Sequence, residues 1–127
     1  MRYATRNLVV LVFSAFVAAC GNDTTQPTAA AGTLGVRLAS PLGAEGAALI
    51  ELRGPVHAVS ATGGQLYELD EDGVRRVLVI MDEAGPISFA IEVPDTSDPP
   101  EYEILQVSAP DDELRADLTG YTLEFVQ

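Results

Sequence analysis

The sequence predicts an all-β fold: a single antiparallel β-sandwich of about eight short strands over residues 33–127. Three observations lead to this prediction. From residue 33 onward apolar and polar residues alternate, which is typical of strands that bury one face. Turn-forming residues, mainly Gly, Pro and Asp, interrupt this pattern roughly every 8–12 residues. A helical period of about 3.6 residues is almost absent from the same region.

The first four strands are expected at 33–39, 47–53, 56–61 and 65–69. In the first of them, Leu34, Val36 and Leu38 fall on one face. The second follows a glycine-rich turn, and the third consists of small side chains and ends at a pair of glycines. The fourth leads into the sequence Asp-Glu-Asp-Gly, which is suited to a tight turn.

The last four strands are expected at 74–81, 87–93, 102–109 and 121–126. Residues 87–93 show the cleanest alternation of apolar and polar residues. Phe89 and Phe125 are expected in the core. Residues 94–101 contain three prolines and two aspartates and should form a loop. Residues 110–120 are expected to form a connection. Its sequence allows one helical turn, capped by Asp111 or Asp112.

Residues 1–19 differ sharply from the rest of the chain. Arg2 and Arg6 precede an uncharged apolar run that continues to Ala19, which is the pattern of a secretory signal peptide. The run has about 12 residues, or roughly 18 Å as a helix, whereas the hydrocarbon core of a bilayer is about 30 Å thick. The prediction is therefore a cleaved signal; the alternatives are a short membrane anchor and a buried helix.

The signal ends in Val-Ala-Ala-Cys-Gly, which resembles the bacterial lipobox. The resemblance implies that the Cys20 thiol receives a diacylglyceryl group and that cleavage leaves Cys20 as the first mature residue. Cys20 is the only cysteine, so an internal disulfide is impossible. Several acyl chains, at about 0.8 kcal/mol per buried CH₂, hold a protein stably on a membrane. The alternatives are ordinary secretory cleavage nearby and an incidental cysteine.

Residues 20–32 are predicted to be the lipidated cysteine and a flexible tether, because the segment is small, polar and almost uncharged. This layout resembles that of small bacterial lipoproteins, a resemblance that implies no particular activity. The predicted location is the cell envelope, outside the cytoplasm. Gly21 follows the cysteine where an Asp would signal inner-membrane retention in some bacteria, so the outer membrane is favoured where one exists.

The mature part of the chain is strongly acidic. It carries all 19 acidic residues, whereas its basic residues are five arginines and no lysine. Its side-chain charge is therefore 5 − 19 = −14. This excludes nucleic acid as an expected partner, because phosphate backbones require basic surfaces. It also disfavours direct contact with anionic lipid. The alternative is that the charge serves solubility alone.

Several segments of the predicted domain resemble the cohesin-like sandwich, which has an immunoglobulin-like architecture. They are Gly-Thr-Leu-x-Val at 32–36, Gly-Ala-Ala-Leu-Ile-Glu-Leu at 46–52, and the apolar runs at 75–80 and 86–91. The resemblance implies a β-sandwich over residues 33–127. Cohesins bind dockerin modules, but no residue here matches a dockerin-contact motif, so that partner is not carried over.

Catalytic and metal sites are not predicted. His57 is the only histidine, and its spacing to Ser60 predicts opposite faces of a strand, without the Gly-x-Ser-x-Gly motif of a hydrolase. One histidine and one cysteine cannot complete a zinc shell. The Asp-Glu-Asp-Gly sequence at 70–73 is interpreted as a hairpin turn, with calcium binding by Asp70 and Asp72 as the alternative.

Two further groups of side chains are candidate ligand sites. The strand acids are expected to face solvent, with a glycosidase pair among them as the alternative; they are Glu51, Glu68, Glu92, Glu103 and Glu124. The mature tyrosines are the candidates for a sugar-stacking platform; they are Tyr67, Tyr102 and Tyr121.

The sequence therefore predicts a lipid-anchored, non-enzymatic β-sandwich without a cofactor or metal. The expected role is binding of an envelope protein or a polysaccharide, or a structural role in the envelope. The alternative is an extracellular domain that binds carbohydrate or has weak hydrolytic activity.

Overall fold

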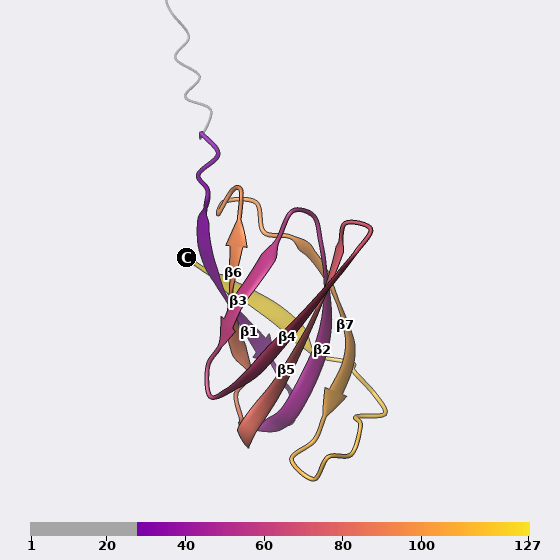
Figure 1. Ribbon diagram of the computed structural model, residues 1–127. Helices are drawn as coiled ribbons and strands as arrows, with labels where there is room; N and C mark the ends of the chain where they lie inside the picture. Colours follow the sequence, from indigo (N-terminus) through magenta and orange to yellow (C-terminus); the bar gives the residue numbers. More distant parts are fainter. Residues whose placement is uncertain (1–27) are drawn as a thin grey trace, which may run out of the picture.

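The computed structural model describes residues 28–127, and Figure 1 colours this part by position along the chain. The predicted signal peptide, Cys20 and most of the predicted tether lie outside the described residues. The last part of the tether contacts the domain, since the carbonyl of Ala30 accepts a hydrogen bond of 2.9 Å from the backbone N–H of Thr96. Within residues 28–127 there is no helix with the length and apolar character needed to cross a membrane.

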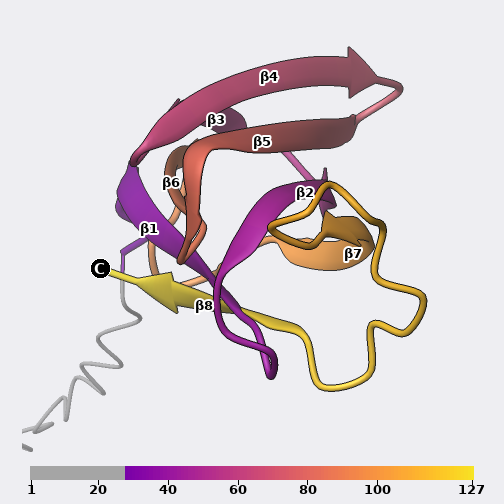
Figure 2. The same ribbon diagram turned by 90° about the horizontal axis from the view of Figure 1, so that it is seen from below.

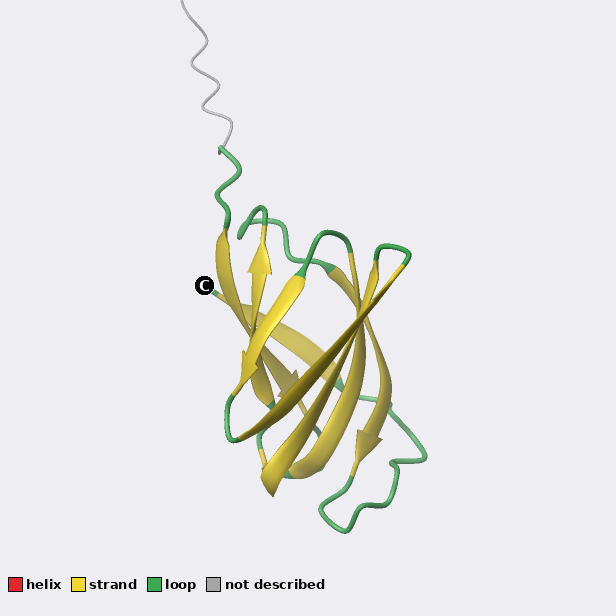
Figure 3. Cartoon of the chain, in the orientation of Figure 1, coloured by secondary structure: helices red, strands yellow, loops and turns green. Residues whose placement is uncertain are grey.

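Eight antiparallel strands form the domain, which confirms the predicted all-β sandwich. They are β1 (Gly32–Ala39), β2 (Glu45–Arg53), β3 (His57–Ala61), β4 (Gly64–Glu71), β5 (Val74–Gly85), β6 (Ser88–Val93), β7 (Glu101–Ser108) and β8 (Thr122–Val126). Each strand falls on a segment that the alternation predicted, with ends that differ by a few residues. Figure 3 shows only strands and loops in this part of the chain.

The strands form two four-stranded sheets that face each other across the core (Figure 2). The first sheet has the order β3-β6-β1-β8 and the second has the order β4-β5-β2-β7. Consecutive strands β1 and β2 therefore belong to different sheets, and so do β3 and β4. Each sheet contributes one face to the interior, which is why the period-two pattern recurs in strands of both sheets.

The core consists of aliphatic and aromatic side chains from the two inner faces. Leu34, Val36 and Leu38 are buried together on β1, as the alternation predicted, and Phe89 is buried opposite them on β6. Phe125 is partly buried and packs against this cluster. The other buried members are Ala48, Ile50, Leu52, Val56, Val77, Val79, Ile87, Ile91, Val93, Val107, Tyr121 and Leu123.

The β4–β5 hairpin has the tight turn that its sequence predicted. Glu71 pairs with Val74, so the loop has two residues, Asp72 and Gly73, with φ angles of 52° and 78°. Two consecutive residues with positive φ define a type I′ turn, whose twist matches that of the flanking strands. The Asp-Gly sequence is thus explained by backbone geometry.

Strand β3 contains a bulge that changes which residues share a face. The bulge lies between Ala58 and Ser60, and because of it Ala58 and Ala61 both pack against the core although they are three positions apart. His57 and Ser60, which precede them, therefore both lie on the outer face. The prediction that His57 and Ser60 face opposite ways was wrong, because a bulge inserts one residue into the period-two pattern.

The connection between β7 and β8 contains no helical turn, so the turn that the sequence allowed there is not formed. The Asp111 carboxylate accepts a hydrogen bond of 3.3 Å from the backbone N–H of Glu113, and Asp112 has a left-handed φ of 67°. The N–H of Ala109 donates to the carbonyl of Glu113 at 2.8 Å. Aspartate readily forms such local turns, which compete with its role as a helix cap.

Candidate functional site: the outer face of the second sheet

The outer face of the second sheet carries a continuous row of apolar side chains. In β5, Val77 and Val79 point into the core, so Leu78 and Ile80 point outward. Leu78 pairs with Tyr67 of β4 on one side and with Leu49 of β2 on the other. We call the resulting surface the apolar stripe; its residues are Leu49, Tyr67, Leu69, Leu78, Ile80 and Leu114. Tyr67, Leu69, Ile80 and Leu114 are exposed, and Leu49 and Leu78 are half-buried.

Leu114 joins the apolar stripe from the connection after β7. It forms an isolated antiparallel bridge with Ser108, and the backbone N–H of Arg115 donates to the carbonyl of Val107 at 2.8 Å. These contacts hold the connection beside the end of β7. Leu114, Leu49 and Leu78 together line a shallow hollow of about 60 Å³.

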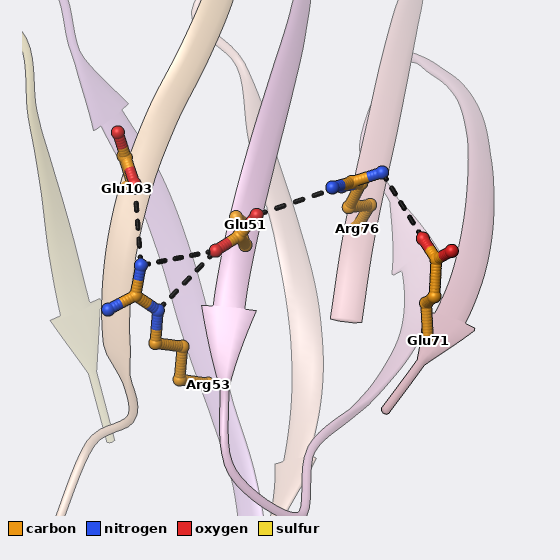
Figure 4. A network of polar contacts seen from close by, with 5 residues as sticks. All are labelled: Glu51, Arg53, Glu71, Arg76 and Glu103. Atoms are coloured by element: carbon orange, nitrogen blue, oxygen red, sulfur yellow. Dashed lines mark hydrogen bonds and ion pairs between the residues drawn. The ribbon is translucent and has the colours of Figure 1, made fainter. Parts of the chain in front are cut away.

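A row of ion pairs crosses the same face beside the apolar stripe, since Arg76 pairs with Leu69 of the stripe and with Glu51. Figure 4 shows the ion pairs of this row. We call it the charged row; its residues are Glu71, Arg76, Glu51, Arg53 and Glu103. Glu51 is central: its Oε1 lies 3.3 Å from Nη2 of Arg53, and its Oε2 lies 3.6 Å from Nε of Arg76. Arg53 also reaches Glu103 at 3.5 Å, and Arg76 reaches Glu71 at 3.3 Å.

The charged row leaves an acidic margin on the apolar stripe. Both arginines are bound between carboxylates, and three carboxylates face two guanidinium groups. Glu71 and Glu103 stay more than half exposed. Because exposed ion pairs contribute only about 0–1 kcal/mol each, the row does not explain the stability of the sheet. It does determine the sign of the charge that a partner meets.

Glu45 is a buried acid that the sequence analysis did not identify. It lies at the start of β2 and is 1% exposed. Its Oε1 accepts hydrogen bonds of 2.6 Å from the hydroxyls of Ser40 and Tyr121. Its Oε2 accepts a hydrogen bond of 3.0 Å from Nε of Arg115 and lies 3.0 Å from Nη2 of the same guanidinium. Since Arg115 follows Leu114, this cluster fixes the connection that completes the apolar stripe.

The environment of Glu45 also determines its pKa. Burial raises the pKa, but the hydrogen bonds from Ser40, Tyr121 and Arg115 favour the charged form more strongly and hold the pKa below its usual value of 4.5. The pKa of Tyr121 is raised from its usual value of 10.0 by burial and by its bond to the Glu45 carboxylate. At neutral pH the cluster therefore contains a carboxylate, a guanidinium and a neutral phenol.

The three tyrosines do not form a platform for sugars. Tyr67 lies on the outer face of the second sheet, whereas Tyr121 is buried and bound to Glu45. Tyr102 pairs with the buried Leu52, and its ring packs against Phe125 with a centroid distance of 6.0 Å. The prediction of a shared platform of these three tyrosines is therefore wrong, because the three side chains lie in three different environments.

Of the five strand acids, four face outward as predicted. Glu51 and Glu103 belong to the charged row, Glu124 is paired with Arg37 at 2.6 Å, and Glu92 is exposed on β6. Glu68 is the exception, because it pairs with Val77 and so points to the inner side of edge strand β4. There its carboxylate accepts hydrogen bonds from the backbone N–H of Ala58 and from Arg75, which joins β4 to edge strand β3 of the other sheet.

The remaining candidates from the sequence are separated or already occupied by protein groups. His57 Nδ1 lies 3.9 Å from Glu68 Oε1, and no hydrogen bond links His57 with Ser60 in the described residues. The Asp70 carboxylate lies 3.2 Å from Arg75 Nη2, and Asp72 belongs to the hairpin turn. Within residues 28–127, no three His, Cys, Asp or Glu side chains are grouped as ligands for a metal ion.

Comparison with known proteins found no matching family, no matching curated protein and no matching solved structure. The resemblances to the lipobox and to the cohesin-like sandwich therefore stay predictions from the sequence.

Proposed function

We propose that this protein is a lipid-anchored, non-catalytic binding module of the cell envelope. The observation that carries the proposal is the apolar stripe. A soluble domain rarely leaves a contiguous group of large apolar side chains on its surface, and such patches mark interaction sites. Four of its six side chains are exposed although the domain buries a complete core elsewhere.

The proposed anchor is Cys20, acylated after removal of residues 1–19. Its support is the lipobox-like sequence behind a basic head and an apolar run. Residues 21–29 lie between Cys20 and Ala30, whose carbonyl is bonded to the domain. At about 3.3–3.6 Å per residue, this segment could span roughly 30 Å if extended, enough to hold the domain clear of lipid headgroups.

Replacing Cys20 with serine is expected to abolish lipidation and membrane attachment. The hydroxyl is a far weaker nucleophile than a thiolate and does not accept the diacylglyceryl group. Full-length wild type and Cys20→Ser would be expressed in a bacterium that processes lipoproteins and compared by membrane fractionation and intact-mass measurement. A Thr24→Ser variant serves as the control and should remain attached. Normal cleavage and attachment of Cys20→Ser would refute the anchor.

The binding role is tested in the same cells with a photoreactive residue at one of two exposed positions. In place of Leu69 on the apolar stripe, the probe is expected to give a discrete crosslink to an envelope component. In place of Val126, on the outer face of the first sheet, it should give none. Equal crosslinking at both positions, or none at either, would contradict a binding role for the stripe.

A further inference from the structure

We propose that the apolar stripe binds a cationic polypeptide segment that presents apolar side chains on one face. This inference rests on the proposed binding function and names the chemical class of the partner. Three observations support it: the absence of a large cavity on the stripe, the charge around it and the charge of the chain as a whole.

The shape of the stripe, which is long and has only a small hollow, points to a polypeptide partner. The stripe runs across β4, β5 and β2 to Leu114, and neighbouring strands are about 4.8 Å apart, so its length is of the order of 15 Å. The hollow at Leu114 measures about 60 Å³, whereas sites for small organic ligands usually measure about 300–1,000 Å³. A row of side chains from an extended or helical segment can cover the stripe, but a small ligand would not be enclosed.

The surrounding charge points to a cationic partner. On one side the charged row has an excess of carboxylate, with Glu71 and Glu103 exposed. At the Leu114 end of the stripe, Asp111 and Glu113 lie in the same connection as Leu114 and are exposed. The arginines Arg53 and Arg76 of this face are already held by carboxylates. Lysine or arginine beside the apolar residues of a partner would therefore meet acids along one side of the stripe and at its Leu114 end.

The total charge argues against two other occupants. The chain has a formal net charge of −12, so an anionic polymer would be repelled. A second copy would bring the same charge and the same acidic margins to a face-to-face contact. Opposite charge in the partner removes this repulsion and increases the association rate.

The test uses the mature protein, purified in a mild non-ionic detergent from a bacterium that processes it, and three immobilised synthetic 14-residue peptides. The first alternates lysine and leucine, the second lysine and serine, and the third glutamate and leucine. The lysine–leucine peptide is expected to bind at least about tenfold more tightly than either of the others. The comparison separates the requirement for apolar side chains from the requirement for positive charge.

Two double variants locate the binding on the protein. Leu69→Ser with Ile80→Ser removes apolar side chains that are 57% and 43% exposed on the stripe. Val59→Ser with Val126→Ser makes the same kind of change at 54% and 55% exposed positions of the first sheet. The first pair should weaken binding of the lysine–leucine peptide at least about tenfold, and the second should leave it unchanged. Circular dichroism and thermal melting confirm that both variants are folded.

Each outcome decides a different point. Equal loss of binding in both double variants, or in neither, overturns the stripe as the site and the proposed function with it. Stripe-dependent binding of the glutamate–leucine peptide, as strong as that of the lysine–leucine peptide, leaves the binding function standing and refutes the cationic partner. A wild-type dimer in sedimentation that Leu69→Ser with Ile80→Ser dissociates makes the occupant a second copy and also refutes the inference.

Discussion

Replacing Glu45 with alanine is expected to lower the free energy of unfolding by about 3–5 kcal/mol, because the substitution breaks a buried ion pair from one side. The carboxylate is 1% exposed and accepts every hydrogen bond of its cluster. Without it, the buried Tyr121 hydroxyl and the Arg115 guanidinium lose their acceptor. Arg115 stays partly accessible to water, which places the expected loss toward the lower end. Urea unfolding at pH 7, followed by circular dichroism, measures the change.

The same carboxylate should make stability depend on pH. Its pKa in the folded state lies below 4.5, so its contribution is complete above the unfolded-state pKa and is lost as pH falls through the folded-state pKa. The difference in unfolding free energy between wild type and Glu45→Gln should therefore be constant near neutral pH and shrink below about pH 4.5. Asp95 and Asp117 also have lowered pKa values, but both remain in the variant and cancel in the difference.

Tyr121→Phe is the matched control for this cluster. It removes one neutral donor and leaves Ser40 and Arg115 bound to Glu45, so a loss of about 1 kcal/mol is expected at pH 7. If Glu45→Ala were no more damaging than Tyr121→Phe, or if the Glu45→Gln difference did not depend on pH, Glu45 would not be the buried charged centre of the cluster.

The sequence could predict the strands but not this cluster. Alternation is a local property, and the interior positions of β1, β2, β5 and β6 follow it closely. Glu45 lies two residues before the apolar run from which β2 was predicted, and its partners Arg115 and Tyr121 are 70 and 76 residues away. No local pattern links three such positions, and a buried acid is improbable until its partners are known.

The candidate binding face could likewise be predicted only in part from the sequence. Leu49, Leu78 and Ile80 each belong to a predicted strand, and the period of two in a strand puts Leu78 and Ile80 on the face opposite Val77 and Val79. The order of strands in the sheet was needed to show that these outward residues are neighbours of Tyr67. Bulges limit prediction further, because the extra residue in β3 reversed the expected relation of His57 and Ser60.

Two isoleucine substitutions, one on each face of the second sheet, are expected to lower the free energy of unfolding by different amounts. Ile50 of β2 is 0% exposed and faces the core, so Ile50→Ala should lower the free energy of unfolding by about 2–5 kcal/mol. Ile80 of β5 lies on the apolar stripe, and Ile80→Ala should lower it by less than about 1 kcal/mol. Urea unfolding of the two variants and wild type under one condition gives both values.

The comparison is informative because the side-chain period of a strand is two. A slip of one residue in β5 would send Ile80 into the core and bring Val77 and Val79 to the surface. A large loss from Ile80→Ala would therefore refute the register of β5, and with it the apolar stripe and the partner inferred from it. Should Ile50→Ala prevent folding altogether, Ile50→Val offers a milder deletion, with an expected loss of about 0.5–1.5 kcal/mol. A small loss from Ile80→Ala would mean that its exposed side chain contributes little to folding, which is the condition for a side chain that is available to a partner.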